Sequence, residues 1–313
     1  MSSGSKKVII AALVGNSLIT ITKFIAASLT RSSAMLSEGI HSLVDTGNQV
    51  LLLFGMRQAK KPASELHPYG RGKEIYFWSF VVAILIFALG AGISIYEGIK
   101  HILHPVPIEN PMINYIVLGC ACLFEGAAWM VALKEFSKTK GETGYLEAVH
   151  RGKDPTTFLV LFEDSAALLG LLVAFIGILL GQITGNPLYD GVASVIIGLI
   201  LGVTALWLAI ETKSLLIGEG ARKEMLREIR KTVQACAEIE KVNEILTMHM
   251  GPDYILVTIS LDFNNQITAS QVEASVKELD GMLKKMSPLI KKVFIEARSI
   301  KSGQPPDPKT HGH

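Results

Sequence analysis

Long apolar runs separated by polar breaks fill the first two-thirds of this chain of 313 residues. A helix that crosses a bilayer needs about 20 mostly apolar residues. Six successive segments have that length and character, which predicts a polytopic α-helical membrane protein. The six predicted membrane-spanning helices cover residues 8–30, 34–58, 75–103, 112–136, 156–182 and 188–212.

A different pattern begins after residue 213, where charged and apolar residues alternate as they do in soluble domains. Two segments have helical spacing and three have the alternation of strands. Their order, helix, strand, strand, helix, strand, predicts a small α+β layer with one open sheet face, which favours pairing with a second copy. The helices are expected at 221–236 and after Thr268, and the strands at Val242–Met250, Tyr254–Phe263 and Lys291–Arg298.

These patterns predict three parts of the chain. Residues 1–213 form a transmembrane domain, residues 214–300 form a cytoplasmic α+β dimerisation domain, and the proline-rich tail 301–313 is disordered. Basic residues gather in the breaks on one side of the predicted helices, which places both termini in the cytoplasm. The first apolar run is too long for a signal peptide and is expected to stay as a span. The compact length favours a bacterial inner membrane.

Composition agrees with a membrane protein and excludes several other classes. Charged residues make up 19% of the chain, whereas soluble domains carry about 25%. A net charge of +2 gives no reason to expect a nucleic-acid partner. The three cysteines include no CxxC pair, so neither a disulfide framework nor a thiolate metal cage is predicted. Nothing in the composition indicates a cofactor.

Four ionisable residues stand inside two of the apolar segments. His41 and Asp45 are one helical turn apart and share a face of the predicted second span. Glu163 and Asp164 are neighbours in the fifth span. A charge at the centre of a membrane helix costs roughly 2.5–3.5 kcal/mol on insertion scales, and such residues commonly mark ion or proton pathways. The alternative is that they form buried hydrogen-bonded pairs that hold the helices together.

An imidazole and a carboxylate one turn apart offer half of a tetrahedral site for a divalent metal. Asn48, one turn beyond Asp45, is a candidate for a supporting hydrogen bond or a further oxygen. Other polar residues in the spans are better explained by structural roles than by metal ligation. Among these, Lys23 is a candidate partner for a carboxylate, Glu125 for a proton path, and Asp190 for the outer membrane interface.

Residues 32–49, which read SxxxLSEGIHSLVDTGNQ, resemble the second span of the cation diffusion facilitator family. The loop LHPYGRGKE, the six predicted spans and the α+β domain are also similar to that family. The resemblance covers residues 8–300. It implies a homodimeric, proton-coupled exporter of zinc or a related divalent ion, with a cytoplasmic domain of ferredoxin-like type.

The resemblance also implies a transport site with two residues at i, i+4 on the second span and two on the fifth. On the second span they fall on His41 and Asp45. On the fifth, Asp164 matches, but four residues earlier stands Val160, which cannot bind metal, so Glu163 is the expected substitute. An acid-rich site is harder, which weakens the preference for zinc over manganese or iron(II).

Two further metal sites that occur in the family are not expected in this chain. In the loop after the second span, Arg71 stands where a second histidine would be needed beside His67. In the last strand, Glu296 and Arg298 occupy positions where metal-binding members carry ligands, and His249 is the one histidine of the α+β domain.

The sequence therefore predicts proton-coupled efflux of a divalent cation, with zinc as the first choice. Two interpretations from other classes stay open at this point. An intramembrane metal-dependent hydrolase would hold a metal with the same residues, although no HExxH-like motif is present. A membrane scaffold that does not transport would use the α+β domain for partner contacts.

Overall fold

The computed structural model describes residues 3–140 and 155–299. The chain divides into two compact units, Met1–Leu216 and Ile217–His313. The predicted tail 301–313 lies outside the described residues, as do residues 141–154 of the predicted break between the fourth and fifth spans.

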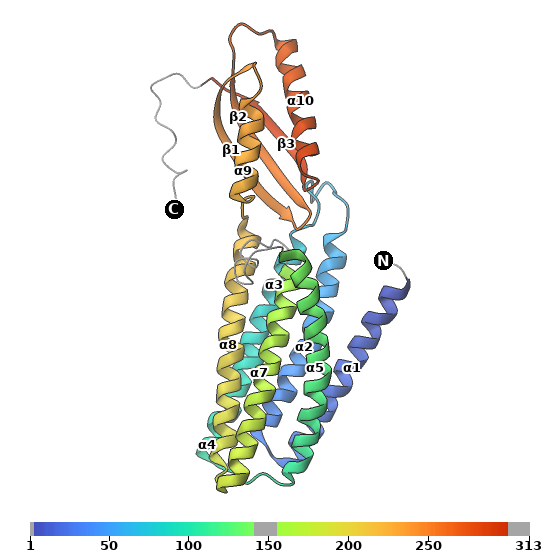
Figure 1. Ribbon diagram of the computed structural model, residues 1–313, viewed down its shortest axis with the longest axis vertical. Helices are drawn as coiled ribbons and strands as arrows, with labels where there is room; N and C mark the ends of the chain where they lie inside the picture. The colour runs from blue at the N-terminus through green and yellow to red at the C-terminus, as the bar shows by residue number, and fades with distance from the viewer. Residues whose placement is uncertain (1–2, 141–154, 300–313) are drawn as a thin grey trace. The chain divides into compact units, whose positions relative to one another are not determined.

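The first unit consists of long helices that alternate in direction along the chain (Figure 1). A π-helical stretch, η1, lies inside the third of them and joins α3 to α4 without a break. The elements are α1 (Ser3–Thr30), α2 (Ser33–Ala59), α3 (Glu74–Leu85), η1 (Ile86–Ala91), α4 (Gly92–Leu103), α5 (Pro111–Lys140), α7 (Pro155–Thr184) and α8 (Leu188–Ile217).

Within the described residues, four helices are long and apolar enough to cross a membrane: 74–103, 111–134, 158–184 and 188–217. The second predicted span forms as helix α2, but its frequent polar residues keep its apolarity below that of these four. The count of six spans therefore stays a prediction. The first unit is a helical, membrane-type structure.

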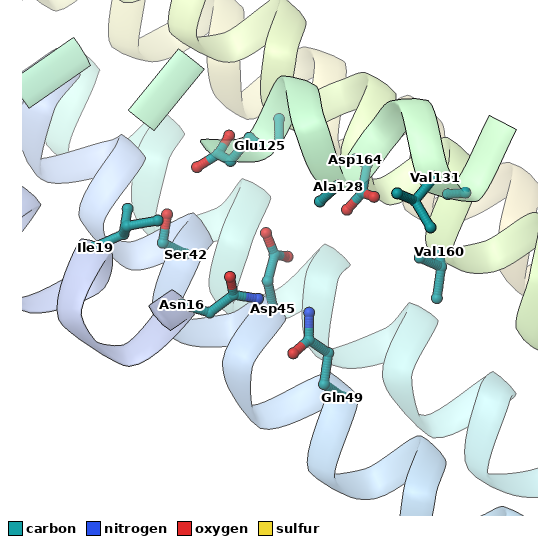
Figure 2. A pocket seen from close by; sticks show the side chains of 12 residues that line it. Asn16, Ile19, Ser42, Asp45, Gln49, Glu125, Ala128, Val131, Val160 and Asp164 are labelled. Carbon is teal, nitrogen blue, oxygen red and sulfur yellow. The ribbon is translucent and has the colours of Figure 1, made fainter. Parts of the chain in front are cut away.

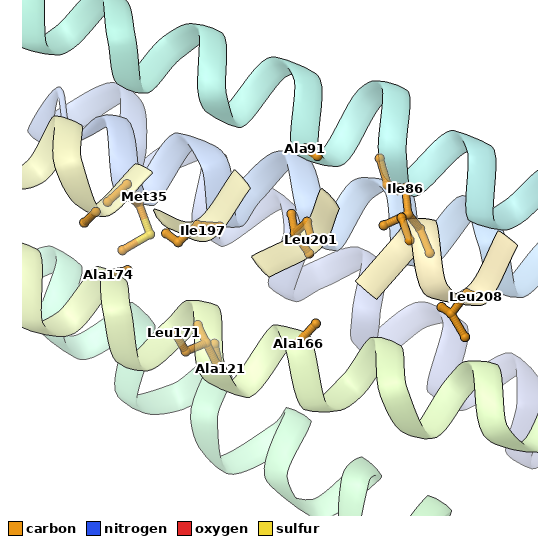
Figure 3. Close-up of a cluster of buried hydrophobic side chains, with 14 of the residues drawn as sticks. Met35, Ile86, Ala91, Ala121, Ala166, Leu171, Ala174, Ile197, Leu201 and Leu208 are labelled. Atoms are coloured by element: carbon orange, nitrogen blue, oxygen red, sulfur yellow. The ribbon is translucent and has the colours of Figure 1, made fainter. Parts of the chain in front are cut away.

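Side chains from α2, η1, α7 and α8, with others from α1, α3 and α5, form the apolar core of this unit (Figure 3). Glycine permits the closest helix contacts, since it leaves room for a neighbouring backbone. A Cβ atom at Gly98 of α4 would lie 2.7 Å from the backbone nitrogen of Val195 in α8. A Cβ atom at Gly198 of α8 would lie 2.9 Å from the backbone nitrogen of Ile95. Helices α4 and α8 are therefore in backbone contact.

The start of α2 is tied to α8 by a buried carboxylate. Ser32 caps the helix and accepts a hydrogen bond from the backbone N–H of Met35. Asp190 accepts from the backbone N–H of Ser33 at 2.5 Å and from the Ser32 hydroxyl at 2.5 Å. Its side chain is fully buried, and its place near the start of α8 leaves the expected position at the outer membrane interface a prediction. A carboxylate is favourable at a helix N-terminus, because the N–H groups there lack partners within the helix.

The second unit is an α+β layer. Its sheet has the order β1-β2-β3, with β1 antiparallel to β2 and β2 parallel to β3. The parallel pair needs a crossover, which α10 provides; a capping box between Thr268 and Gln271 begins that helix. The elements are α9 (Lys223–Gln234), β1 (Ile239–Gly251), β2 (Tyr254–Phe263), α10 (Ala269–Met286) and β3 (Ile290–Ala297).

Both helices of this unit pack on one face of the sheet. Val257, Ile259 and Leu261 of β2 are buried against α9 and α10, whereas the alternating residue Thr258 is exposed. The other face of the three strands is therefore not covered by these helices. The unit agrees with the predicted α+β layer, and the finer assignment to the ferredoxin-like type stays a prediction.

Candidate metal site

A cavity of about 390 Å³ lies among α1, α2, α5 and α7. Its walls combine apolar side chains with carboxyl, amide and hydroxyl groups, which is unusual for the interior of a helical membrane unit. The polar residues that line it are Asn16, Ser42, Asp45, Gln49, Glu125 and Asp164.

Helical spacing explains how α2 presents its polar groups to this cavity. Ser42, Asp45 and Gln49 are three and four positions apart, so they lie on one face of the helix. Asp164 of α7 lines the cavity from another wall, together with Val160 one turn before it. Figure 2 shows the side chains of Asp45 and Asp164 around the same space.

His41 is buried next to Asp45. Its Nδ1 atom lies 3.4 Å from Oδ1 of Asp45. Among the described residues, neither of these atoms has a hydrogen-bond partner, and the Nε2 atom of His41 has none either. A buried polar atom normally has a partner. Unpaired nitrogen and carboxylate atoms this close together are therefore suited to share a cation.

Glu163 has a different environment from its neighbour Asp164. Adjacent residues of a helix point about 100° apart, and Glu163 is buried and does not line the cavity. Its Oε1 atom accepts a hydrogen bond of 2.7 Å from Nδ2 of Asn48. The carboxyl groups of Asp45 and Glu163 are close enough to interact. Glu163 therefore lies behind Asp45, supported by the residue that we expected in a supporting role.

The four predicted ligands thus lie in one region, but they do not form a closed cage. In the part of the chain that the structure describes, no three His, Cys, Asp or Glu side chains are grouped closely enough to hold a metal ion. These side chains fall into three groups. His41 and Asp45 form the first, and Asp164, on another wall of the cavity, is the second. Glu163, hydrogen-bonded to Asn48, is the third.

Glu38 of α2, which the sequence patterns did not single out, is buried in a network next to this cavity. Lys23 is fully buried and donates to Oε2 of Glu38 at 3.0 Å and to Oε1 of Glu125 at 2.8 Å. It also donates to the hydroxyl of Ser42 at 2.8 Å. The spacing of 38, 42 and 45 on one face of α2 was the available signal. The expectation that Lys23 offsets a carboxylate agrees with this network.

Comparison with known proteins identifies the family. Residues 9–217 match the family model described as the cation efflux transmembrane domain. That match covers more than half of the chain. The chain belongs to the cation efflux family. This is the cation diffusion facilitator family to which the sequence motifs pointed.

Individual relatives carry names that refer to metals. The mitochondrial proton-coupled zinc antiporter SLC30A9 of Mus musculus is 32% identical over 96% of this chain and 53% of its own length. Metal tolerance protein C4 of Arabidopsis thaliana is 31% identical over 84% of this chain and 58% of its own length. The manganese efflux system protein MneP of Bacillus subtilis is 24% identical over 93% of this chain and 95% of its own length.

Two of these matches are partial on the side of the relative, since the chain spans little more than half the length of the mouse and Arabidopsis proteins. None of the three names describes an enzyme. Membership of a transporter family therefore confirms that the chain is not an enzyme and removes the hydrolase interpretation.

Proposed function

We propose that this protein exports a divalent metal cation in exchange for protons, with zinc as the first choice. One observation carries the proposal. Asp45 and Asp164, from two different helices, line the same cavity within the helical unit, and the unpaired imidazole of His41 lies beside Asp45. Oxygen and nitrogen ligands near the middle of spanning helices are the usual arrangement of secondary transporters.

The donor set supports zinc and leaves a specific second candidate. Zinc binds imidazole nitrogen and carboxylate oxygen in tetrahedral sites. Val160 lines the cavity at the position where the family pattern would place another ligand, so oxygen donors predominate. Harder donors suit manganese and iron(II) as well, and one relative is named as a manganese efflux protein. Manganese or iron(II) is therefore the alternative cargo.

Proton coupling follows from the chemistry of the same ligands. Imidazole must be neutral and carboxyl groups must be ionised to bind a metal, so protons and cations compete for one site. Proton entry from the far side favours metal release, and proton loss to the cytoplasm restores the site. Alternating access of the cavity to the two sides would complete the cycle.

Both termini are proposed to lie in the cytoplasm. The basic residues concentrate in the breaks on the same side of the spans as the termini, and such loops usually face the cytoplasm. We retain a bacterial inner membrane as the proposed location. A mitochondrial membrane is the alternative, because the mouse relative is named as mitochondrial.

We also propose that two copies pair through the open face of the α+β unit. Leu246, Thr258 and Phe294 stand opposite one another in register across the three strands, and both apolar members of this row are exposed. Lys292 flanks the row on one side, and Glu296 flanks it on the other. A two-fold axis through the row would place the lysine of each copy near the acidic side of the other, which is the self-complementarity that a symmetric dimer requires.

The decisive experiment is metal flux into proteoliposomes with an acidic lumen, measured for zinc, manganese and iron(II). We expect zinc uptake that disappears when the pH gradient is collapsed and when Asp45 is changed to alanine. Manganese or iron(II) uptake without zinc uptake would support the alternative cargo. Absence of flux for every metal in the folded wild-type protein would contradict the transport proposal.

A further inference from the structure

The network around Lys23 touches the cavity through two of its members. Lys23 is fully buried and hydrogen-bonds Glu38, Ser42 and Glu125. Of these partners, Ser42 and Glu125 line the cavity, together with Asp45 and Asp164. Glu38 does not line it. The ammonium group therefore lies directly behind the cavity wall.

Glu125 uses only one of its carboxyl oxygens in this network. Oε1 accepts from Lys23 at 2.8 Å. Oε2 is buried and has no hydrogen-bond partner among the residues that the structure describes. Desolvating a carboxylate oxygen without a partner is costly. An unpaired oxygen in the wall of a polar cavity is explained if a cation from the cavity becomes its partner.

Other atoms that are unpaired within the described ranges lie in this region. Oε1 of Glu38 is one, but it faces Gly170 of α7 and not the cavity. Oδ1 of Asp45, which lines the same cavity, also lacks a hydrogen-bond partner within the described chain, and so do both ring nitrogens of the buried His41 beside it. Unpaired acceptors therefore occur on α2 and α5 around one space. The three N–H donors of the Lys23 ammonium group are already engaged by its three partners, so that group has no donor left for Asp45.

The composition of the network agrees with this. One ammonium group, that of Lys23, faces two carboxyl groups, those of Glu38 and Glu125. Glu38 packs against α7, where a Cβ atom at Gly170 would collide with its Oε1. Glu125 is the carboxyl group of the trio that lines the cavity, so it is the one that a cation in the cavity would meet.

We propose that Glu125 is an additional cation-binding residue of the transport cavity and that Lys23 is its positioning residue. This inference rests on the proposed transport function and deepens it. Glu125 contributes a carboxyl group from a third helix, α5, to the cavity that Asp45 of α2 and Asp164 of α7 also line. In the described residues these groups are not close enough together to enclose an ion, so the inference is that Glu125 contacts the cation in the cavity, not that the three form a finished cage. Lys23 holds one oxygen of Glu125 and leaves the other for a divalent cation. This assigns Glu125 a role in binding cargo, which we did not expect from the sequence.

The test compares two nearly matched variants, Glu125→Gln and Glu38→Gln. Each removes one carboxylate from Lys23 and keeps the shape of the side chain, but only Glu125 lines the cavity. We expect Glu125→Gln to raise the KM for zinc in proteoliposome flux, and the Kd for zinc in solution, at least about tenfold. We expect Glu38→Gln to change both by less than about twofold, because Glu38 does not reach the cavity.

A positioning role for Lys23 predicts a further result. Lys23→Gln removes the ammonium group and should raise the KM for zinc. Combining Lys23→Gln with Glu38→Gln removes one positive and one negative group together, so the balance of charge in the network is restored. The double variant still lacks the ammonium group that hydrogen-bonds Glu125. We therefore expect the double variant to recover thermal stability but not the KM. Recovery of both would mean that Lys23 acts only by balancing charge, which would overturn its positioning role.

If Glu125→Gln does not fold, a second variant, Glu125→Asp, tests the role of Glu125 in cation binding. Glu125→Asp keeps the charge opposite Lys23 and withdraws the second oxygen by one methylene, so an increase in KM at unchanged thermal stability is expected. Equal KM values for wild type, Glu125→Asp and Glu38→Gln would overturn the inference. Wild-type flux with no effect at Glu125 would refute this inference alone, whereas absence of wild-type flux would refute the transport function itself.

Discussion

At the scale of single residues, the adjacent acids Glu163 and Asp164 show how the helix separates neighbouring chemistry. Asp164 lines the cavity opposite Asp45, whereas Glu163 is turned to the amide of Asn48. The sequence presented these two acids as one pair. The structure divides them between the cavity and the support behind it, because adjacent helical positions point about 100° apart.

The hydrogen bond between Asn48 and Glu163 leads to a stability prediction. Asn48→Ala removes the amide donor to a buried carboxyl oxygen of Glu163, and a hydrogen bond to a charged group contributes about 1.5–3 kcal/mol. We expect the thermal unfolding temperature in detergent to fall, with a loss of stability in that range.

A double-mutant cycle with Glu163→Gln isolates the contribution of this pair. Because the two residues are in contact, their effects should not be additive. Additive losses would show that Asn48 stabilises the protein through other contacts.

At the scale of elements, the backbone contact between α4 and α8 constrains the helical unit closely. Gly98 faces the backbone of Val195 and the carbonyl oxygen of Gly191, which cannot move aside as a flexible side chain would. Asp190 of the same helix α8 holds the N-terminus of α2. Helix α8 therefore contacts α4 along its backbone and anchors the helix that carries His41 and Asp45.

The glycine contact can be tested by a single methyl group. Gly98→Ala places a Cβ 2.7 Å from the Val195 backbone nitrogen, and overpacking of this kind costs about 1–3 kcal/mol. We expect a lower unfolding temperature in detergent.

Gly119→Ala in α5 is the matched control, because a Cβ atom there would meet nothing within 4 Å. In that exposed position alanine should be neutral or stabilising by up to about 1 kcal/mol, through its higher helix propensity. Equal effects of the two substitutions would contradict the close approach of α4 and α8.

At the scale of the whole molecule, competition between protons and metal leads to a pH prediction. Zinc binding requires a neutral imidazole and ionised carboxyl groups, so protonation weakens it. We expect the Kd for zinc to rise as the pH falls and zinc binding to release protons. Calorimetric titrations in buffers of different ionisation enthalpy would measure that release. Binding that does not change with pH would separate metal transport from proton exchange.

The proposed dimer gives a second prediction at this scale. Leu246→Asp places a charge in the exposed row of the open sheet face and should convert a dimer of the 313-residue chain in detergent to monomers. Ala274→Asp on the exposed surface of α10 adds the same charge elsewhere on the unit and should leave the dimer intact. Sedimentation of the two variants would decide the matter, and a Leu246→Asp protein that stays dimeric would refute pairing through this face.

Much of this protein follows from its sequence alone. Hydrophobic periodicity predicted the helical unit, the strands of the α+β layer and their order, because side-chain spacing of 3.6 and 2 residues is a local property of helices and strands. The same local geometry placed His41 and Asp45 on one face of α2. The sequence motifs also identified the family, which the family model confirmed.

Only the tertiary structure decided which side chains from different helices meet. Periodicity tells which residues share a face of one helix, but not how that helix is rotated against its neighbours; packing contacts such as Gly98 with Val195 set the rotation. Three contacts depend on this rotation of the helices. They are the burial of Asp190, the hydrogen bond from Asn48 to Glu163, and the pairing of Lys23 with Glu38 and Glu125. The convergence of Glu125, Asp45 and Asp164 on one cavity has the same physical origin.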